Sequence, residues 1–329
     1  MMKMRAAAVA CGLFLVALTV AAAQANPNRW RHEWPKTDFT KHSVDYDDIM
    51  SGGPPKDGIP SIDKPEFVPI ADAEDLAATE PVVGLIINGD ARAYPLRILI
   101  WHEIVNDVVG GVPVSVTFCP LCNAAVVFDR RVAGRVLEFG TTGKLRYSDL
   151  IMYDRQSESW WQQFVGEAIV GEMLGSKLKL VPARLESFAK FKTRAPNGKV
   201  QVPNNPGMRR YGMNPYAGYD SLDTPFLYRG KMPSEVAPLA RVVAVGDRAW
   251  SLALLRKKAR IETKDGLVLT WEAGQNSSLD STVISDGRDV GNVVVQRRDG
   301  DGKLRDVDYR VDFAFAFHAF RPDIKIQTK

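Results

Sequence analysis

The stretch VSVTFCPLCNAAVVFDR, residues 114–130, decides most of what the sequence predicts about the fold. Two runs rich in β-prone residues, VPVSVTF and AAVVFDR, flank the segment Cys119-Pro120-Leu121-Cys122. Short apolar runs bounded by turn-forming residues are typical of β-strands. The sequence therefore predicts that both cysteines lie in a turn between two strands, with no helix for many residues after Cys122.

This placement argues against the familiar uses of a Cys-x-x-Cys pair. A thioredoxin-type pair lies at a helix N-terminus, where the helix dipole lowers the pKa of the first thiol. A c-type haem attachment requires histidine after the second cysteine, and Asn123 stands there. A metal knuckle, as in rubredoxin-like or zinc-ribbon sites, fits a strand-to-strand turn better, but a second knuckle is absent from the sequence.

The N-terminus predicts export. Residues 1–25 have a positive start at Lys3 and Arg5, an apolar stretch and the small-residue cleavage site Ala23-Gln24-Ala25, which together indicate a secretory signal peptide. A lipid anchor at Cys11 is the less favoured alternative, because too few apolar residues precede it. We expect a periplasmic protein in which two cysteines remain, in a compartment where disulfides persist.

The remaining chain is nearly neutral. Removal of the signal peptide lowers the formal charge from 43 − 39 = +4 to 41 − 39 = +2. A nearly neutral exported chain is a poor match for nucleic acid. No later stretch reaches the roughly 18 apolar residues of a membrane span, so we expect none in the mature protein. Its partner is expected to be an unidentified envelope component or a small ligand.

Two histidines are candidates to join the thiols. His102 lies shortly before the strand that carries Cys119, and His318 follows the alternating run FAFAF, interpreted as a buried strand that bends there. Two thiolates and an imidazole form a soft site for Cu(I), or for Zn(II) with a further ligand. The alternatives are a packed histidine beside a structural Cys119–Cys122 disulfide, and a catalytic thiol pair.

Six ordered blocks resemble those of the bacterial domain of unknown function 3179, over roughly residues 57–325. The resemblance implies export or membrane association, but no settled activity. Members of the family often end in Phe-His-Pro-Asp, and Arg321 here replaces that histidine. The resemblance therefore implies either that His318 serves in its place or that its role is lost. The blocks are DGIPSIDKPEF, NGDARAYPLRILIWHEIVND, VTFCPLCNAAVVFDR, FGTTGKLRYSDLIMYDRQSESWWQQ, GEAIVGEMLGSKLKLVPA and FAFHAFRPD.

The overall pattern predicts a β-rich α+β fold with few short helices. Residues 26–66 form an irregular arm, and residues 67–329 form a single large domain. Helices are expected at residues 96–109 and in SLALLRKKARI. GDARAYPL is echoed by GDRAWSL 157 residues later, which predicts two related halves, approximately residues 67–185 and 225–329, joined by an irregular aromatic-rich segment.

Aromatic residues supply further candidates for ligand contact. The joining segment is rich in tyrosine, glycine and proline, a composition typical of a binding loop. The candidates are Tyr211, Tyr216, Tyr219, Trp160 and Trp161. A core position is the competing interpretation for the two tryptophans.

The functional prediction is an exported metal-handling or thiol-redox protein centred on the Cys119 to Cys122 turn, with copper or zinc as its metal. The alternative is a non-catalytic binding or scaffold module in which the cysteines form a structural disulfide. A third option is an enzyme acting on an envelope substrate, although no phosphate loop, nucleophile elbow or zinc-protease motif is present in the sequence.

Overall fold

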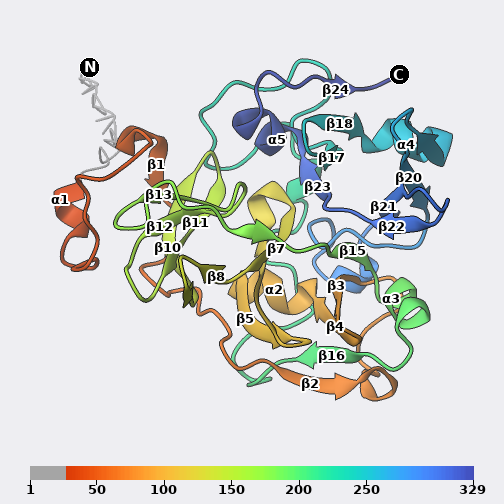
Figure 1. Cartoon of the computed structure of the whole chain (residues 1–329), viewed down its shortest axis with the longest axis horizontal. Helices are drawn as coiled ribbons and strands as arrows, with labels where there is room; N and C mark the ends of the chain where they lie inside the picture. The colour runs from red at the N-terminus through yellow and green to blue at the C-terminus, as the bar shows by residue number, and fades with distance from the viewer. Residues whose placement is uncertain (1–26) are drawn as a thin grey trace, which may run out of the picture.

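The computed structural model describes residues 27–329, so the expected signal peptide lies outside the described residues. Strands dominate, and they form five sheets of four or five strands in a propeller-like arrangement (Figure 1). A two-stranded ribbon of β8 (Arg131–Val132) and β9 (Arg135–Val136) completes the strands. The expectation of a β-rich fold is confirmed.

Sheets 1 and 2 are antiparallel throughout, and sheet 2 carries the turn with the two cysteines. Sheet 1 consists, in order, of β1 (Ile49–Ser51), β10 (Phe139–Arg146), β11 (Asp149–Asp154), β12 (Trp160–Gln162) and β13 (Glu167–Val170). Sheet 2 consists of β14 (Lys179–Leu180), β7 (Ala124–Asp129), β6 (Val112–Cys119) and β5 (Ile104–Val109).

Sheets 3 and 4 each have a central antiparallel hairpin with one further strand that lies parallel to its neighbour in the hairpin. Sheet 3 consists of β15 (Arg184–Ser187), β3 (Pro81–Ile87), β4 (Asp90–Pro95), β16 (Lys199–Val202) and β2 (Glu66–Pro69). Sheet 4 consists of β23 (Arg310–Phe313), β17 (Arg241–Val245), β18 (Arg248–Ser251) and β24 (Ile326–Gln327).

Sheet 5 is an antiparallel meander at the C-terminal side of the molecule. It consists of β19 (Arg260–Glu262), β20 (Leu267–Glu272), β21 (Asn292–Arg298) and β22 (Leu304–Asp306).

Helices are short, and four of them begin directly where a strand ends. The described helices are α1 (Pro27–Trp30), α2 (Leu96–His102), α3 (Phe188–Arg194), α4 (Leu252–Lys258) and α5 (Ala314–Phe320). The last strand residue serves as N-cap, and Ser187 and Ser251 accept hydrogen bonds from Lys190 N and Leu254 N. None of the helices in residues 27–329 is long and apolar enough to cross a membrane.

The expectation of two related halves is wrong. Sheet 1 has no counterpart in residues 225–329, and the five sheets form a propeller-like arrangement instead. The echo of GDARAYPL in GDRAWSL reflects a local similarity, since each forms part of a hairpin followed by a seven-residue helix, α2 or α4. Strand, tight turn and strand is a common local motif, so its recurrence does not establish a duplication.

Two predicted elements change type in the structure. The helix predicted at residues 96–109 ends at His102, because Glu103 adopts a left-handed conformation (φ 57°), and residues 104–109 form β5. The run FAFAF is a strand only as far as Phe313, after which the alanine-rich residues 314–320 form α5. Alanine has the highest helix propensity, which here outweighs the two-residue alternation.

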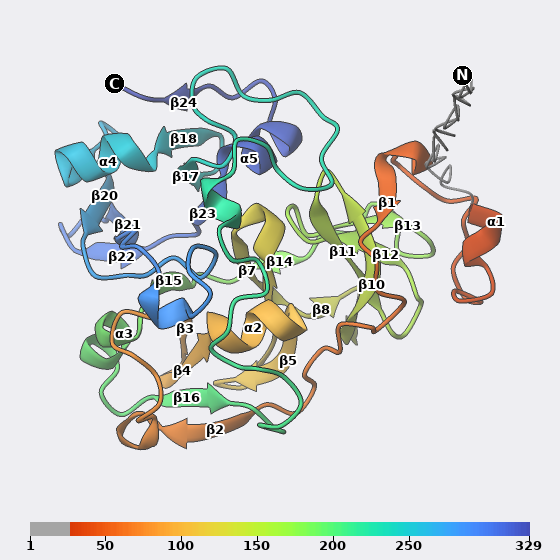
Figure 2. The ribbon, with the colours of Figure 1, turned by 180° about the vertical axis from the view of Figure 1, so that it is seen from behind.

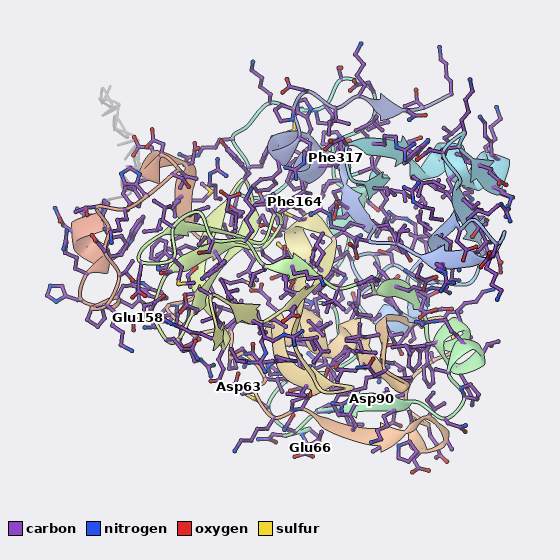
Figure 3. All side chains as sticks on the ribbon, in the orientation of Figure 1. Asp63, Glu66, Asp90, Glu158, Phe164 and Phe317 are labelled. Carbon is purple, nitrogen blue, oxygen red and sulfur yellow. The ribbon has the colours of Figure 1, made fainter. Side chains whose placement is uncertain are left out.

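The N-terminal arm packs against sheet 1. Trp34 and Phe39 are buried beside Trp160, with ring centroids 5.3 and 5.4 Å away. Lys56 in this arm forms an ion pair of 2.8 Å with Glu158, which Figure 3 labels. The arm is therefore an ordered part of the fold.

The largest core is formed by residues of sheets 1 to 4 and includes both cysteines. Phe164 and Phe317, labelled in Figure 3, belong to this core. Figure 2 shows that the segment between β16 and β17, residues 203–240, runs as a long coil past α2 to the side that holds α5. This coil brings distant residues to the turn with the cysteines.

The arm contacts β10 at Gly143, where the pairing of β10 with β11 is irregular between Thr141 and Lys144. Gly143 has φ +67°, and a Cβ added there would lie 1.9 Å from Pro54 O. Gly143→Ala should therefore lower the free energy of unfolding by more than about 2 kcal/mol, measured by urea denaturation.

The matched control is Gly134→Ala in the β8–β9 turn. Gly134 also has a positive φ, +76°, but its added Cβ has no neighbour within 4 Å. Gly134→Ala should lower the free energy of unfolding only by the cost of placing alanine at a positive φ, about 1 kcal/mol. Equal losses in the two variants would show that the approach of Pro54 is not what requires glycine at position 143.

Candidate metal centre

The structure brings two thiols and one carboxyl group together. The sulfur atoms of Cys119 and Cys122 and a carboxylate oxygen of Asp149 all lie within 4.8 Å of one another. All three residues are buried, and both cysteines are free thiols. We call Cys119, Cys122 and Asp149 the thiol cluster.

The turn that carries the cysteines is built by local sequence. Cys119 ends β6 in an extended conformation, Pro120 begins a single 3-10 turn, and Asn123 ends it in the left-handed conformation (φ 51°). Proline fixes the φ angle that the turn requires, and asparagine tolerates the left-handed region better than most residues. The prediction of a strand-to-strand turn is thus confirmed by β6 and β7.

Distant residues hold this turn in place. Asn123 Nδ2 donates a hydrogen bond of 2.8 Å to Val311 O in β23. Tyr219 donates its hydroxyl hydrogen to Leu121 O at 2.9 Å. The position of the thiols therefore depends on residues 98 and 188 positions away in the sequence.

Asp149 reaches the thiols from the β10–β11 hairpin of sheet 1. One carboxylate oxygen, Oδ2, accepts hydrogen bonds from Gln162 Nε2 (2.6 Å) and Phe164 N (2.9 Å). The other oxygen, Oδ1, is buried without a hydrogen-bond partner in the described part of the chain. In the same hairpin, Ser148 O accepts the Cys119 thiol hydrogen at 3.5 Å.

Backbone strain is concentrated around this cluster. Of the ten non-glycine residues with positive φ in residues 27–329, five lie in the cluster's turn, within two residues of a cluster member, or in the wall of the adjacent cavity. Such conformations cost about 1–3 kcal/mol each and are found preferentially at functional sites. The five residues are Glu103, Asn123, Tyr147, Ser148 and Leu227.

Burial favours the uncharged form of every acidic group here. Burial raises the pKa of Glu103 from 4.5 to about 8 and that of Asp149 from 3.8 to about 7, and repulsion by Asp149 contributes to the shift of Glu103. Burial also raises the pKa of the Cys119 thiol, and that of Cys122 is raised well above its ordinary value. The environment therefore does not stabilise a thiolate by itself.

A guanidinium group lies near Asp149. The guanidinium of Arg310 lowers the pKa of Asp149, although less than burial raises it. Arg310 Nε lies 3.4 Å from Asp312 Oδ2, a second buried carboxyl whose pKa burial raises to about 6. A single guanidinium cannot neutralise the thiol cluster, Glu103 and Asp312 together.

A cavity of about 340 Å³ adjoins the cluster. Cys119 and Glu103 line it, together with Lys144 and Tyr216. Its other walls are apolar side chains and glycine. They comprise Gly52, Pro54, Ile59, Pro120, Leu121, Gly143, Leu145, Leu150, Phe226 and Leu227.

The two candidate histidines lie outside the thiol cluster. His102 is buried, with Nδ1 2.7 Å from Pro60 O and Nε2 2.8 Å from Tyr211 Oη, so both ring nitrogens are in hydrogen bonds. His318 is half-buried on α5. Neither is among the groups within 4.8 Å of one another.

The aromatic candidates take different positions. Tyr216 lines the cavity, and Tyr219 bonds to the turn, whereas Tyr211 bonds to His102. Trp160 and Trp161 are fully buried in the core. The irregular segment that contains the three tyrosines thus contributes to the cavity wall and to the support of the turn.

Sequence reasoning missed Asp149 and Glu103. Asp149 follows Tyr147-Ser148, an unusual pair for a tight hairpin turn, and this pair was the available signal. Glu103 is adjacent to the histidine that drew attention. Its side chain lines the cavity because the helix ends there.

The raised pKa values predict how stability depends on pH in the metal-free protein. Between pH 4.5 and about 8, Glu103 is protonated in the folded state and ionised in the unfolded state. The folded state then binds more protons, so stability falls as pH rises through this range. Urea denaturation should show that Glu103→Gln reduces this fall by on the order of a few kcal/mol.

The control for this pH series is Glu74→Gln, because Glu74 is exposed. Its dependence on pH should match that of the wild type. An unchanged slope in Glu103→Gln would show that this carboxyl is not held in its neutral form.

A family model described as a protein of unknown function, DUF3179, matches residues 56–324. Searches of curated proteins and of solved structures return no match. The match covers most of the chain, as the sequence blocks indicated. The chain therefore belongs to the DUF3179 family.

Proposed function

We propose that this is an exported metal-handling protein of the periplasm, in which the thiol cluster binds a divalent transition-metal ion. The observation that carries the proposal is the donor set. Two sulfurs and a carboxylate oxygen lie within 4.8 Å of one another, fully buried. Asp149 also has one oxygen without a hydrogen-bond partner in the described chain, which is costly unless a ligand satisfies it.

Electrostatics favours metal binding over thiol-redox chemistry. A redox-active cysteine needs a lowered pKa, whereas burial raises the pKa of both thiols here. A bound metal replaces the thiol protons and supplies the positive charge that the cluster lacks. The turn also contains only a three-residue 3-10 helix, too short to provide a helix dipole.

The donors favour zinc over copper. Cu(I) prefers thiolate and thioether ligands, whereas Zn(II) accepts thiolate, imidazole and carboxylate together. The expected third donor is the imidazole of His102, but the third group of the cluster is the carboxylate of Asp149, whose oxygen is a harder donor. Copper is the second candidate, since the two thiolates alone suit Cu(I).

The scaffold alternative has a different basis. A Cys119–Cys122 disulfide would close a very small loop and stabilise the fold little through chain entropy. In the structure both cysteines are free thiols. The alternative would gain support if the purified protein contained neither free thiols nor metal.

Cobalt titration tests the proposal. The reduced mature protein should bind about one equivalent of Co²⁺ with thiolate-to-metal charge-transfer absorption, and Zn²⁺ should displace it. Cys119→Ser with Cys122→Ser should abolish binding, and Asp149→Asn should weaken it by at least about tenfold. Cu(I) competition in the same assay ranks the two candidate metals.

Two control variants are available. Asp312→Asn removes another buried carboxyl of the same core that lies outside the thiol cluster, and His102→Gln removes the expected imidazole. Both should retain stoichiometric cobalt binding. Absence of cobalt binding by the reduced wild type, or wild-type affinity in Asp149→Asn, would contradict the proposed centre.

A further inference from the structure

The cavity beside the thiol cluster is connected to that cluster through Cys119. Of the three cluster residues, Cys119 lines the cavity, whereas Cys122 and Asp149 do not. Phe226 and Leu227 also line it, and they are 48% and 42% exposed. The cavity is thus lined both by a buried cysteine and by residues exposed at the protein surface.

Coordination number leaves room for a ligand from this cavity. Zn(II) usually has four ligands, and sites with three protein ligands keep the fourth position for water or substrate. The thiol cluster supplies three donors. Because Cys119 borders the cavity, the cavity offers a space beside the cluster for a fourth ligand.

Charge selects a neutral molecule for this position. Two thiolates and one carboxylate around a divalent ion leave one net negative charge, which disfavours an anionic ligand. Lys144, a cation in the cavity wall, has its ammonium 3.9 Å from a carboxylate oxygen of Glu33 and is thereby partly neutralised. Glu103, also in the wall, supplies no positive charge.

The shape and walls select an apolar body. Leu121, Leu145, Leu150 and Ile59 line the space, and its volume of about 340 Å³ lies at the lower end of the range for small-molecule sites. Ser148, the residue before Asp149, donates its hydroxyl hydrogen to Phe226 O at 2.5 Å. The surface end of the cavity is thus bonded to the hairpin that supplies the carboxylate donor.

We propose that the fourth coordination position of the bound metal opens into this cavity and receives a small neutral molecule with a nitrogen or sulfur donor on an apolar body. This inference rests on the proposed metal centre. It makes the protein a receptor or enzyme for such a molecule, because a closed structural site would have no exchangeable position.

The test uses 1-alkylimidazoles, from methyl to butyl, added to the Co²⁺-loaded wild-type protein. Each should change the cobalt spectrum saturably. Affinity should rise about fourfold per added methylene group, because each methylene enters an apolar cavity. An unchanged spectrum, or affinity that does not vary with chain length, would overturn the inference.

Two tryptophan variants localise the binding. Ile59→Trp fills the cavity and should weaken 1-butylimidazole binding at least tenfold while the cobalt spectrum without imidazole stays unchanged. Ile86→Trp is the matched control, because Ile86 is 40% exposed on β3 and does not line the cavity. Equal imidazole affinity in both variants would place the ligand elsewhere and overturn the inference.

Glu103→Gln separates an open site from a closed one. With Glu103 outside the coordination sphere, the cobalt spectrum without imidazole should be unchanged in this variant. An altered spectrum would identify Glu103 as a fourth protein ligand and overturn the open position.

Failure of cobalt to bind at all would overturn the metal centre itself, whereas a normal cobalt spectrum without an imidazole response would overturn this inference alone. If Ile59→Trp does not fold, the series of 1-alkylimidazoles on the wild-type protein still decides whether the ligand enters an apolar cavity.

Discussion

The central constraint in this protein is the burial of several acidic groups where one guanidinium lies. Two thiols, the carboxyls of Asp149 and Glu103, and that of Asp312 lie in or beside the main core, and Arg310 cannot balance them all. Ionising an acidic group in an apolar environment is costly. Burial therefore raises the pKa of each of these groups, and the geometry of sheets 1 and 2 brings the two thiols and Asp149 together.

Strain and support around the turn are consistent with this constraint. The hairpin residues Tyr147 and Ser148 adopt left-handed conformations that glycine or asparagine would occupy more easily. Such a conformation persists only where its surroundings impose it. Here it brings Asp149 to the sulfurs and directs Ser148 O toward Cys119. The fold thus spends conformational energy on the cluster, as functional sites commonly do.

The sequence predicted those parts of the fold that depend on local pattern. The turn with the cysteines, the hairpin before α2 and the helix in SLALLRKKARI follow from strand runs, turn residues and helical periodicity. The helix predicted at residues 96–109 is longer than the observed helix, because nothing in the apolar spacing signals the positive φ of Glu103 that ends it. The echo of GDARAYPL predicts a duplication that the structure does not have, because a strand, turn and strand motif recurs for local reasons.

The donors of the candidate centre were only half predictable. Cys119 and Cys122 are close in sequence, so their pattern is visible. Asp149 lies on another sheet and becomes their neighbour only through tertiary packing. Proximity in sequence favoured His102, but its ring nitrogens bond to Pro60 and Tyr211. A carboxylate donor carries no local motif, and only the three-dimensional structure reveals it.

The hydrogen bond between Asn123 and Val311 has a consequence for the order of folding. It joins residues 188 positions apart, so the turn reaches its final position only after the C-terminal strand β23 has docked. Contacts of such high sequence separation form late and slowly. Completion of the thiol cluster is then a late event in the folding of the chain, and a C-terminally truncated chain would lack the anchor that fixes the thiols.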